Sequence, residues 1–188
     1  MKHFTNFQRG FSRVRPHNFL LTGLLMLFTI SMLSVFGSEA DASGLQITSG
    51  GFSDGGTIPV QFTCSGVNQS PPLSWSDVPA GTKALALILE DPDAPSGTFV
   101  HWVVYDIRPT SNGFQGGSVE GSEGRNSMGK TAYMGPCPPP GPPHHYHFRL
   151  FALDTDLNLG EPATAQQLRD AMKGHVKESA DLVGTFGR

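Results

Sequence analysis

The chain has 188 residues, which predicts a single domain with room for a sizeable core. Its 13 Lys and Arg residues stand against 16 Asp and Glu, so the formal net charge is −3 at pH 7. This negative balance argues against a nucleic-acid backbone as the partner, because such binding needs a surplus of basic side chains.

Residues 1–42 are predicted to be a secretory signal peptide. Lys2 and three arginines precede an uncharged run over residues 18–38, and the small residues at Ser38–Ala42 suit signal-peptidase cleavage. An uncleaved membrane anchor is the alternative, because about 18 apolar residues lie near the minimum for a membrane span. We therefore expect residues 43–188 to form one exported domain, in the periplasm or outside the cell.

Short strands are expected in the first part of this domain, at Leu45–Thr48, Thr57–Cys64 and Leu73–Trp75. The second of them alternates apolar and polar residues, as a half-buried strand does. Pro59 lies within it and has no N–H to donate, which indicates a sheet edge or a strand start.

Three longer runs predict the central strands. Ala84–Leu89 is continuously apolar, which favours a strand buried on both faces. Phe99–Ile107 is rich in β-branched and aromatic residues, and Tyr146–Leu153 is the third run. Between them, Arg108–Lys130 is polar and rich in Gly and Ser, so we expect it to cross the surface.

One helix is predicted near the end of the chain. Thr164 and Gln167 form a capping-box pattern, and Leu168, Met172 and Val176 follow at helical spacing to about Ala180. Many short strands and one late helix indicate a mainly β antiparallel sandwich rather than alternating βαβ units.

The two cysteines, Cys64 and Cys137, both fall in the domain expected to be exported. They form no CxxC motif and have no metal-type spacing. An exported location permits a disulfide between them, and two separate thiols are the alternative.

Residues 124–131 match the P-loop pattern GxxxxGK[ST]. A working P-loop needs a buried strand before the loop and a helix after it, and neither neighbouring segment has a suitable sequence. The chain also contains no GxSxG nucleophile elbow, and nothing indicates that Cys137 is activated by His144. We therefore predict that the protein is not an enzyme and needs no cofactor.

Two polar stretches indicate a binding site. Asp91, Asp93 and His101 lie within residues 90–102, and a second stretch, residues 135–146, contains adjacent histidines. Carboxylates and imidazoles at strand ends can form a small polar pocket or a metal site. Because neighbouring strand residues point to opposite faces, the alternative is that His145 and His147 lie on a solvated face.

Several segments together resemble the phosphatidylethanolamine-binding protein family, in particular its bacterial YbhB/YbcL branch, also called Raf kinase inhibitor-like. The resemblance covers the predicted domain in order. It rests on residues 70–75, 78–83, 91–95 with 101–104, 135–139 with 144–146, Asp154, and 184–188. His145 departs from the pattern, since the family usually has arginine between the histidine and the tyrosine.

The resemblance implies a Greek-key β-sandwich with a small anion-binding pocket at one end and one helix near the C-terminus. The ligand-binding residues that it implies are Asp91, Asp93, His101, Gly135, Cys137, Pro138, His144 and Tyr146. We expect the aspartates to orient His101 or His144 and to favour the protonated ring, so that affinity for anions rises as the pH falls.

The first functional hypothesis is therefore an exported binding protein for phosphate-bearing head groups or similar small anions. It would touch the membrane only through lipid head groups or an uncleaved signal. The second is an interaction module that inhibits a protease or another enzyme. The third is a metal-assisted hydrolase built on Asp91, Asp93 and the histidines.

Overall fold

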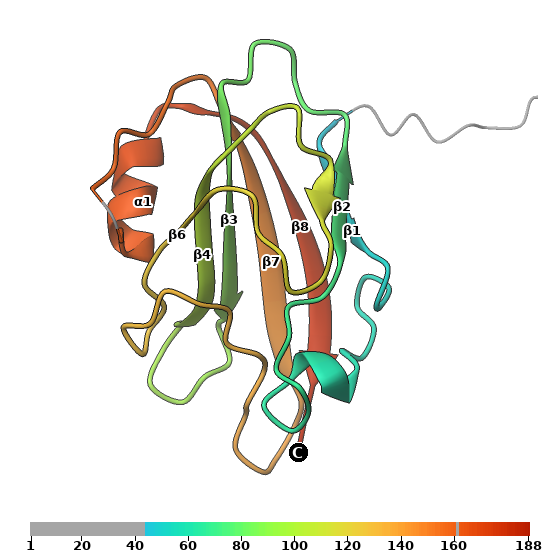
Figure 1. Cartoon of the computed structure of the whole chain (residues 1–188). Coiled ribbons are helices and arrows are strands. Elements are labelled where there is room, and N and C mark those ends of the chain that lie inside the picture. Colours follow the sequence, from blue (N-terminus) through green and yellow to red (C-terminus); the bar gives the residue numbers. More distant parts are fainter. Residues whose placement is uncertain (1–43, 161) are drawn as a thin grey trace, which may run out of the picture. The chain divides into compact units, whose positions relative to one another are not determined.

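The computed structural model describes residues 44–160 and 162–188, which form two antiparallel sheets and one helix (Figure 1). Strand order is β1-β2-β5 in the first sheet and β6-β4-β3-β7-β8 in the second. The predicted mainly β antiparallel sandwich with one helix is confirmed. The elements are β1 (Gln46–Ser49), η1 (Val60–Phe62), β2 (Leu73–Ser76), β3 (Ala84–Asp91), β4 (Phe99–Ile107), β5 (Gly113–Phe114), β6 (Ser122–Glu123), β7 (His144–Leu153), α1 (Ala165–Met172) and β8 (Val176–Phe186).

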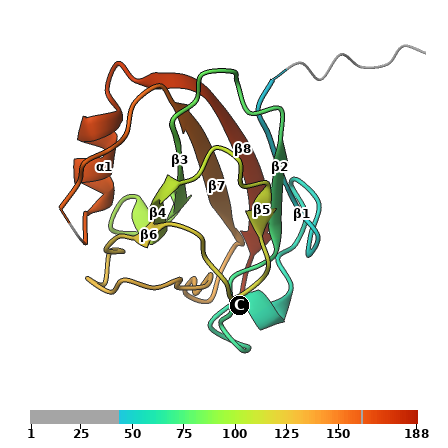
Figure 2. The ribbon, with the colours of Figure 1, turned by 45° about the horizontal axis from the view of Figure 1, so that its top comes forward.

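β3, at the centre of the five-stranded sheet, is buried on both faces. Figure 2 shows the three-stranded sheet on one side of it and α1 on the other. Along β3, Leu85, Leu87 and Leu89 pack into the core between the sheets, whereas Ala86 and Ile88 pack into the core under α1. This two-sided burial explains why the sequence of β3 is continuously apolar.

The three predicted central strands are confirmed as β3, β4 and β7. β3 lies between the other two and pairs antiparallel with both. The bounds of β4 agree with the prediction, while β3 extends to Asp91 and β7 begins at His144. Both extensions carry polar residues, so the apolar pattern alone could not reveal them.

The predicted helix is correct at its start and wrong at its end. Thr164 forms the expected capping box with Gln167 at the start of α1. The helix stops at Met172, since Lys173 leaves helical geometry and Gly174 adopts a φ of +76°. Glycine reaches this left-handed conformation without steric cost, which ends the helix.

The residues predicted to finish the helix instead form β8, the last strand of the larger sheet. It pairs antiparallel with β7 along nearly its whole length, from His144 opposite Phe186 to Leu153 opposite Val176. Leu182, Gly184 and Phe186 point inward at every second position. This long ladder outweighs the local helical spacing of Leu168, Met172 and Val176.

The strand predicted at Thr57–Cys64 is also wrong. Only Thr57 makes an isolated bridge, to Thr185, and Val60–Phe62 forms the short 3-10 helix η1. Pro59 precedes η1 and cannot donate to a sheet ladder, so it marks the end of the extended conformation. The alternating pattern nevertheless buries Ile58 and Phe62.

The predicted signal peptide, residues 1–42, lies outside the described residues. Within residues 44–160 and 162–188, no helix has the length and apolar character needed to cross a bilayer.

Gly184 provides a test of how β8 packs. A Cβ at this position would overlap Ile58 and would lie 2.9 Å from Cε2 of Phe52. We expect Gly184→Ala to lower the free energy of unfolding by about 1–3 kcal/mol in urea denaturation, because the tight core cannot accept the methyl group. Gly160→Ala, whose Cβ would meet no atom within 4 Å, is the control and should change stability little. Equal stability of the two variants would contradict this packing.

Candidate functional site

A pocket of about 250 Å³ lies where β3 ends and where β4 and β7 begin. In Figure 1 this is the lower end of the sheet, where the connection from β3 to β4 and the loop before β7 come together. The lining residues are Asp91, Ala94, Pro95, Ser96, Gly97, Phe99, His101, Met128, Met134, Cys137, Pro138, Pro139 and His144.

The Asp91 carboxylate is held at the base of the pocket by two donors. Oδ2 lies 2.7 Å from Nδ1 of His144, and Oδ1 accepts a hydrogen bond of 2.8 Å from the backbone N–H of Asp93. The side chains of Asp91 and His144 are only 5% and 12% exposed. Asp91 thus fixes the hydrogen of His144 on Nδ1, while Nε2 has no partner among the described residues.

His101 is the second imidazole at the base, and it is 3% exposed. Its Nδ1 lies 2.8 Å from the Met134 carbonyl oxygen, so Nδ1 carries the hydrogen. Burial lowers the pKa of His101, and this effect outweighs the opposing influence of the Met134 carbonyl and the Asp91 charge. As expected, the Asp91 charge favours the protonated ring of His101, but desolvation is the larger effect and lowers the pKa overall.

Tyr146 lies beneath the two imidazoles rather than in the pocket wall. Its ring meets His101 edge-on at 5.3 Å between centroids and stacks with His144 at 6.5 Å. The hydroxyl is fully buried and has no hydrogen-bond partner among the described residues. Burial and the Asp91 charge raise the pKa of Tyr146, so the phenol stays protonated.

Asp93 lies outside the pocket and pairs with His145. One carboxylate oxygen of Asp93 accepts hydrogen bonds from the His145 backbone, at 2.8 Å, and from its ring, at 2.7 Å. These bonds lower the pKa of Asp93, against a smaller effect of burial. The adjacent residues His144 and His145 thus point to opposite faces, and both fasten the end of β3 to the start of β7.

Gly135 does not line the pocket either, and its amide is already used. The N–H donates to the Asn68 side chain at 2.8 Å. A Cβ on Gly135 would overlap the Phe62 carbonyl, so glycine is required for this close approach. The predicted contribution of this amide to anion binding is therefore corrected to a structural one.

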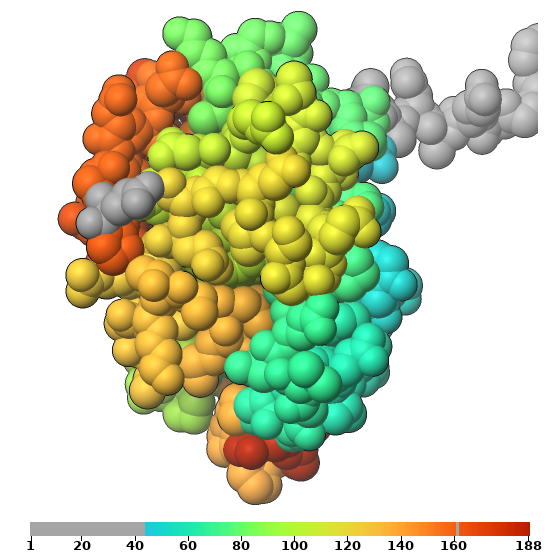
Figure 3. Space-filling view, in the orientation of Figure 1, coloured from blue at the N-terminus to red at the C-terminus, as the bar shows by residue number. Residues whose placement is uncertain are grey.

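The wall that contains Cys137 and Pro138 is tied to two other parts of the chain. Cys137 forms a disulfide with Cys64, and Nε of Arg188 donates to the Pro138 carbonyl at 2.6 Å. Figure 3 shows this wall, in orange, against the segment around η1, in teal. The wall is thus held at several points before a ligand binds.

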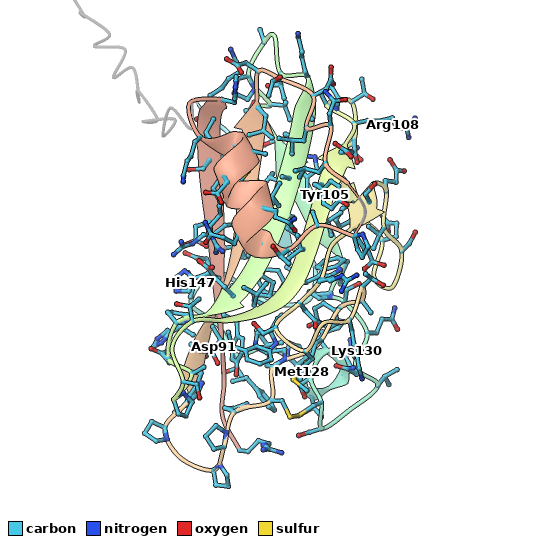
Figure 4. All side chains as sticks on the ribbon, turned by 90° about the vertical axis from the view of Figure 1, so that its left-hand side faces the viewer. Asp91, Tyr105, Arg108, Met128, Lys130 and His147 are labelled. Carbon is cyan, nitrogen blue, oxygen red and sulfur yellow. A yellow bond between two sulfur atoms is a disulfide. The ribbon has the colours of Figure 1, made fainter. Side chains whose placement is uncertain are left out.

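Several lining residues were not predicted as site residues from sequence motifs, notably Phe99, Met128 and Met134. Met128 comes from the P-loop-like segment, which forms a compact loop with no helix after it. In Figure 4, Asp91 and Met128 lie toward the same end of the larger sheet, whereas Tyr105 and Arg108 lie toward the other.

A metal site would require several ligating side chains to converge. In the part of the chain that the structure describes, no group of three or more His, Cys, Asp and Glu side chains has a geometry that could hold a metal ion. Asp91 and Asp93 each bond to a different histidine instead.

Comparisons with known proteins give a consistent result. The family model described as Phosphatidylethanolamine-binding protein matches residues 48–187. A UPF0098 protein of Methanothermobacter thermautotrophicus is 48% identical over 144 residues, which cover 73% of this chain and 95% of that protein. LppC of Mycobacterium tuberculosis, named as a candidate lipoprotein, is 46% identical over 148 residues, covering 77% of this chain and 73% of LppC.

Two crystal structures are also similar. CT736 of Chlamydia trachomatis, described as a candidate PEBP homologue, has a TM-score of 0.75 and 41% identity, over 78% of this chain and 99% of that one. YbcL of E. coli, described as a new member of the mammalian PEBP family, has a TM-score of 0.71 and 29% identity, over 77% of this chain and 98% of that one.

The lowered pKa of His101 predicts a pH-dependent stability. Below the ordinary histidine pKa of 6.5, the unfolded chain binds a proton at His101 that the folded protein excludes. Stability therefore falls as the pH drops from about 6.5 toward the depressed folded pKa. We expect the loss in unfolding free energy between pH 7 and pH 5 to be smaller in His101→Gln than in wild type. His175→Gln, which removes an exposed partner of Asp154, is the control. An unchanged slope in His101→Gln would refute this cause.

The disulfide predicts a second stability effect. It links residues 73 positions apart, so in the chain-entropy model it restricts the unfolded chain by about 4 kcal/mol. We expect the Cys64→Ser/Cys137→Ser double variant to lose stability of this order in urea denaturation without reductant. Dithiothreitol should lower the stability of the wild type but not of the variant. A wild type that is insensitive to reductant would contradict the prediction.

Proposed function

The chain belongs to the phosphatidylethanolamine-binding protein family, and from this premise we propose that it binds small anionic groups, such as the phosphate of a head group, outside the cytoplasm. The resemblance to the YbhB/YbcL branch predicted from the sequence is confirmed. In this proposal the pocket at the end of β3 binds and releases its ligand without chemical change. Neither a cofactor nor a metal takes part.

The observation that carries the proposal is the His144 imidazole at the base of the pocket. Its Nδ1 is already directed at Asp91, so only Nε2 remains for a ligand. A second proton turns Nε2 into a donor, and the resulting imidazolium makes a charge-assisted hydrogen bond to an anion. The Asp91 carboxylate then balances the charge of the ring.

The rest of the pocket supports a small ligand. Asp91 and His101 are each 3% exposed, so the polar groups lie deep and the apolar residues surround them. The buried Tyr146 hydroxyl beneath the rings is a further donor without a partner among the described residues. A bridging water would satisfy it.

Export is proposed on three grounds. The sequence of residues 1–42 has the basic start and the apolar run of a secretory signal. The relative LppC carries a name that places it among candidate lipoproteins. The Cys64–Cys137 disulfide suits an oxidising compartment, such as the periplasm or the outside of the cell.

An interaction role, such as inhibition of a protease, is the second candidate. One observation favours it: residues 139–143 form an exposed, proline-rich rim beside the pocket. Rigid, exposed prolines lose little entropy on binding a protein partner. The ligand measurement below separates the two functions. If the wild type has no affinity for small anions, only the interaction role of the rim remains.

The proposal is tested by calorimetric titration of the mature protein with inorganic phosphate and with phosphorylethanolamine. We expect both to bind, with affinity that rises from pH 8 to pH 6 and with uptake of a proton. His144→Ala should weaken binding by about tenfold or more, the value of a lost charge-assisted hydrogen bond.

The matched control is His175→Ala. It removes the ring of another His–Asp pair, with Asp154, in the turn between α1 and β8. It should bind as the wild type does. No binding by the wild type, or equal affinity in His144→Ala and wild type, would refute the proposed function.

A further inference from the structure

The apolar part of the pocket is rich in sulfur and aromatic groups. Phe99, Met128, Met134 and the disulfide-bonded Cys137 all line it. Met172, the remaining methionine of the described chain, is buried under α1 on the other side of the sheet. The accessible thioethers of the described residues are thus gathered at this site.

Met128 is unusual because it is presented to solvent rather than packed into a core. Its residue surface is 59% exposed, and it belongs to neither hydrophobic core cluster. The fold therefore gains little from this side chain. Methionine is nevertheless placed at the pocket, where its flexible, polarizable thioether can adapt to a ligand.

The loop that carries Met128 is firmly built. Asn126, which is 6% exposed, accepts hydrogen bonds on Oδ1 from the N–H groups of Met128, at 2.9 Å, and Lys130, at 3.0 Å. Its Nδ2 donates to the Ala132 carbonyl at 3.1 Å. A buried amide with both ends bonded fixes the loop around it, so the position of Met128 is set before binding.

A second set of bonds fastens this loop to the start of β4. The Ser127 N–H donates to the Val100 carbonyl at 2.9 Å, and the Val100 N–H donates to Ser127 Oγ at 2.8 Å. Val100 precedes His101, which lies at the base of the pocket. The loop therefore holds Met128 at a fixed place relative to the polar base.

The ligand that suits these walls is an aromatic ring with an anionic substituent. Thioethers make favourable contacts with aromatic rings, and Phe99 adds an aromatic face. A cavity of about 150 Å³ is enough for benzene, so 250 Å³ holds a ring together with a phosphate group. The anion would lie at the deep imidazoles and the ring at the sulfur-rich mouth.

Building on the proposed anion site, we propose that the pocket prefers small aryl phosphates and that Met128 is its specificity-determining residue. Met128 packs on the ring of the ligand, opposite Met134 and Phe99. His144 holds the phosphate group, as proposed above. An alkyl chain of similar size gains burial from the same walls but not the sulfur–aromatic contact.

The experiment compares phenyl phosphate, butyl phosphate and inorganic phosphate by calorimetry. In the wild type we expect phenyl phosphate to bind tightest and inorganic phosphate weakest. Met128→Ala should weaken the affinity for phenyl phosphate by about two- to tenfold, the range of a sulfur–aromatic contact plus lost burial. The affinity for inorganic phosphate should stay within about twofold of the wild-type value. Met128→Leu, which keeps the apolar volume, should lose affinity for phenyl phosphate but not for butyl phosphate.

The matched control is Val176→Ala, which truncates another exposed apolar residue, 44% exposed. Val176 lies opposite Leu153, at the other end of the β7–β8 ladder from His144. It should leave all three affinities unchanged. If inorganic phosphate binds through His144 but the phenyl group adds no affinity, or if Met128→Ala weakens all three ligands equally, the inference is overturned while the anion site stands. If none of the three ligands binds to the wild type, the proposed function itself fails.

Discussion

The Asp91 carboxylate is buried at the end of β3, and its two oxygens take hydrogen bonds from His144 and from the backbone of Asp93. A buried carboxylate without hydrogen-bond donors would be costly, so the segments that supply these donors must stay next to Asp91. The end of β3, the turn after it and the start of β7 are thereby held in one arrangement. The pocket forms against this fixed base, and His144 receives its orientation from it.

The same principle extends to the pocket walls, which come from distant parts of the chain. The Asn68 side chain accepts a hydrogen bond from Gly135, and Arg188 donates one to the Pro138 carbonyl. Cys137 is linked to Cys64 by the disulfide. None of these contacts contributes to the main sheet, yet together they hold a proline-rich loop that has few N–H groups of its own. The glycine at position 135 permits this arrangement, since a side chain there would overlap the Phe62 carbonyl.

The sequence predicted those parts of the fold that depend on local pattern. A continuous apolar run predicted β3, because a strand buried on both faces leaves little place for polar residues. β4 was predicted by its β-branched and aromatic residues, and β7 by its apolar residues at every second position. The first residues of β8, Val176–Ala180, are predicted as helix because Val176 continues the helical spacing of Leu168 and Met172, whereas their pairing with β7 is a long-range effect. At the site, the motifs gave Asp91, His101 and His144. Met128 could not be found from sequence, since its loop is organised by Asn126 through bonds that no periodicity reveals.

The proposed anion site contains a buried aspartate, which requires an electrostatic explanation. Both oxygens of Asp91 accept hydrogen bonds within the protein, and Asp93 bonds to His145 outside the pocket. Burial lowers the pKa of His101, which keeps this ring neutral. His144, in contrast, has the Asp91 carboxylate directly beside its ring. In the proposed complex, an anion at Nε2 would complete a row of alternating charges with a protonated His144 and Asp91. Such a row adds only one new attractive pair, so in this proposal the anion alone gains limited affinity and the apolar walls supply the remaining selectivity.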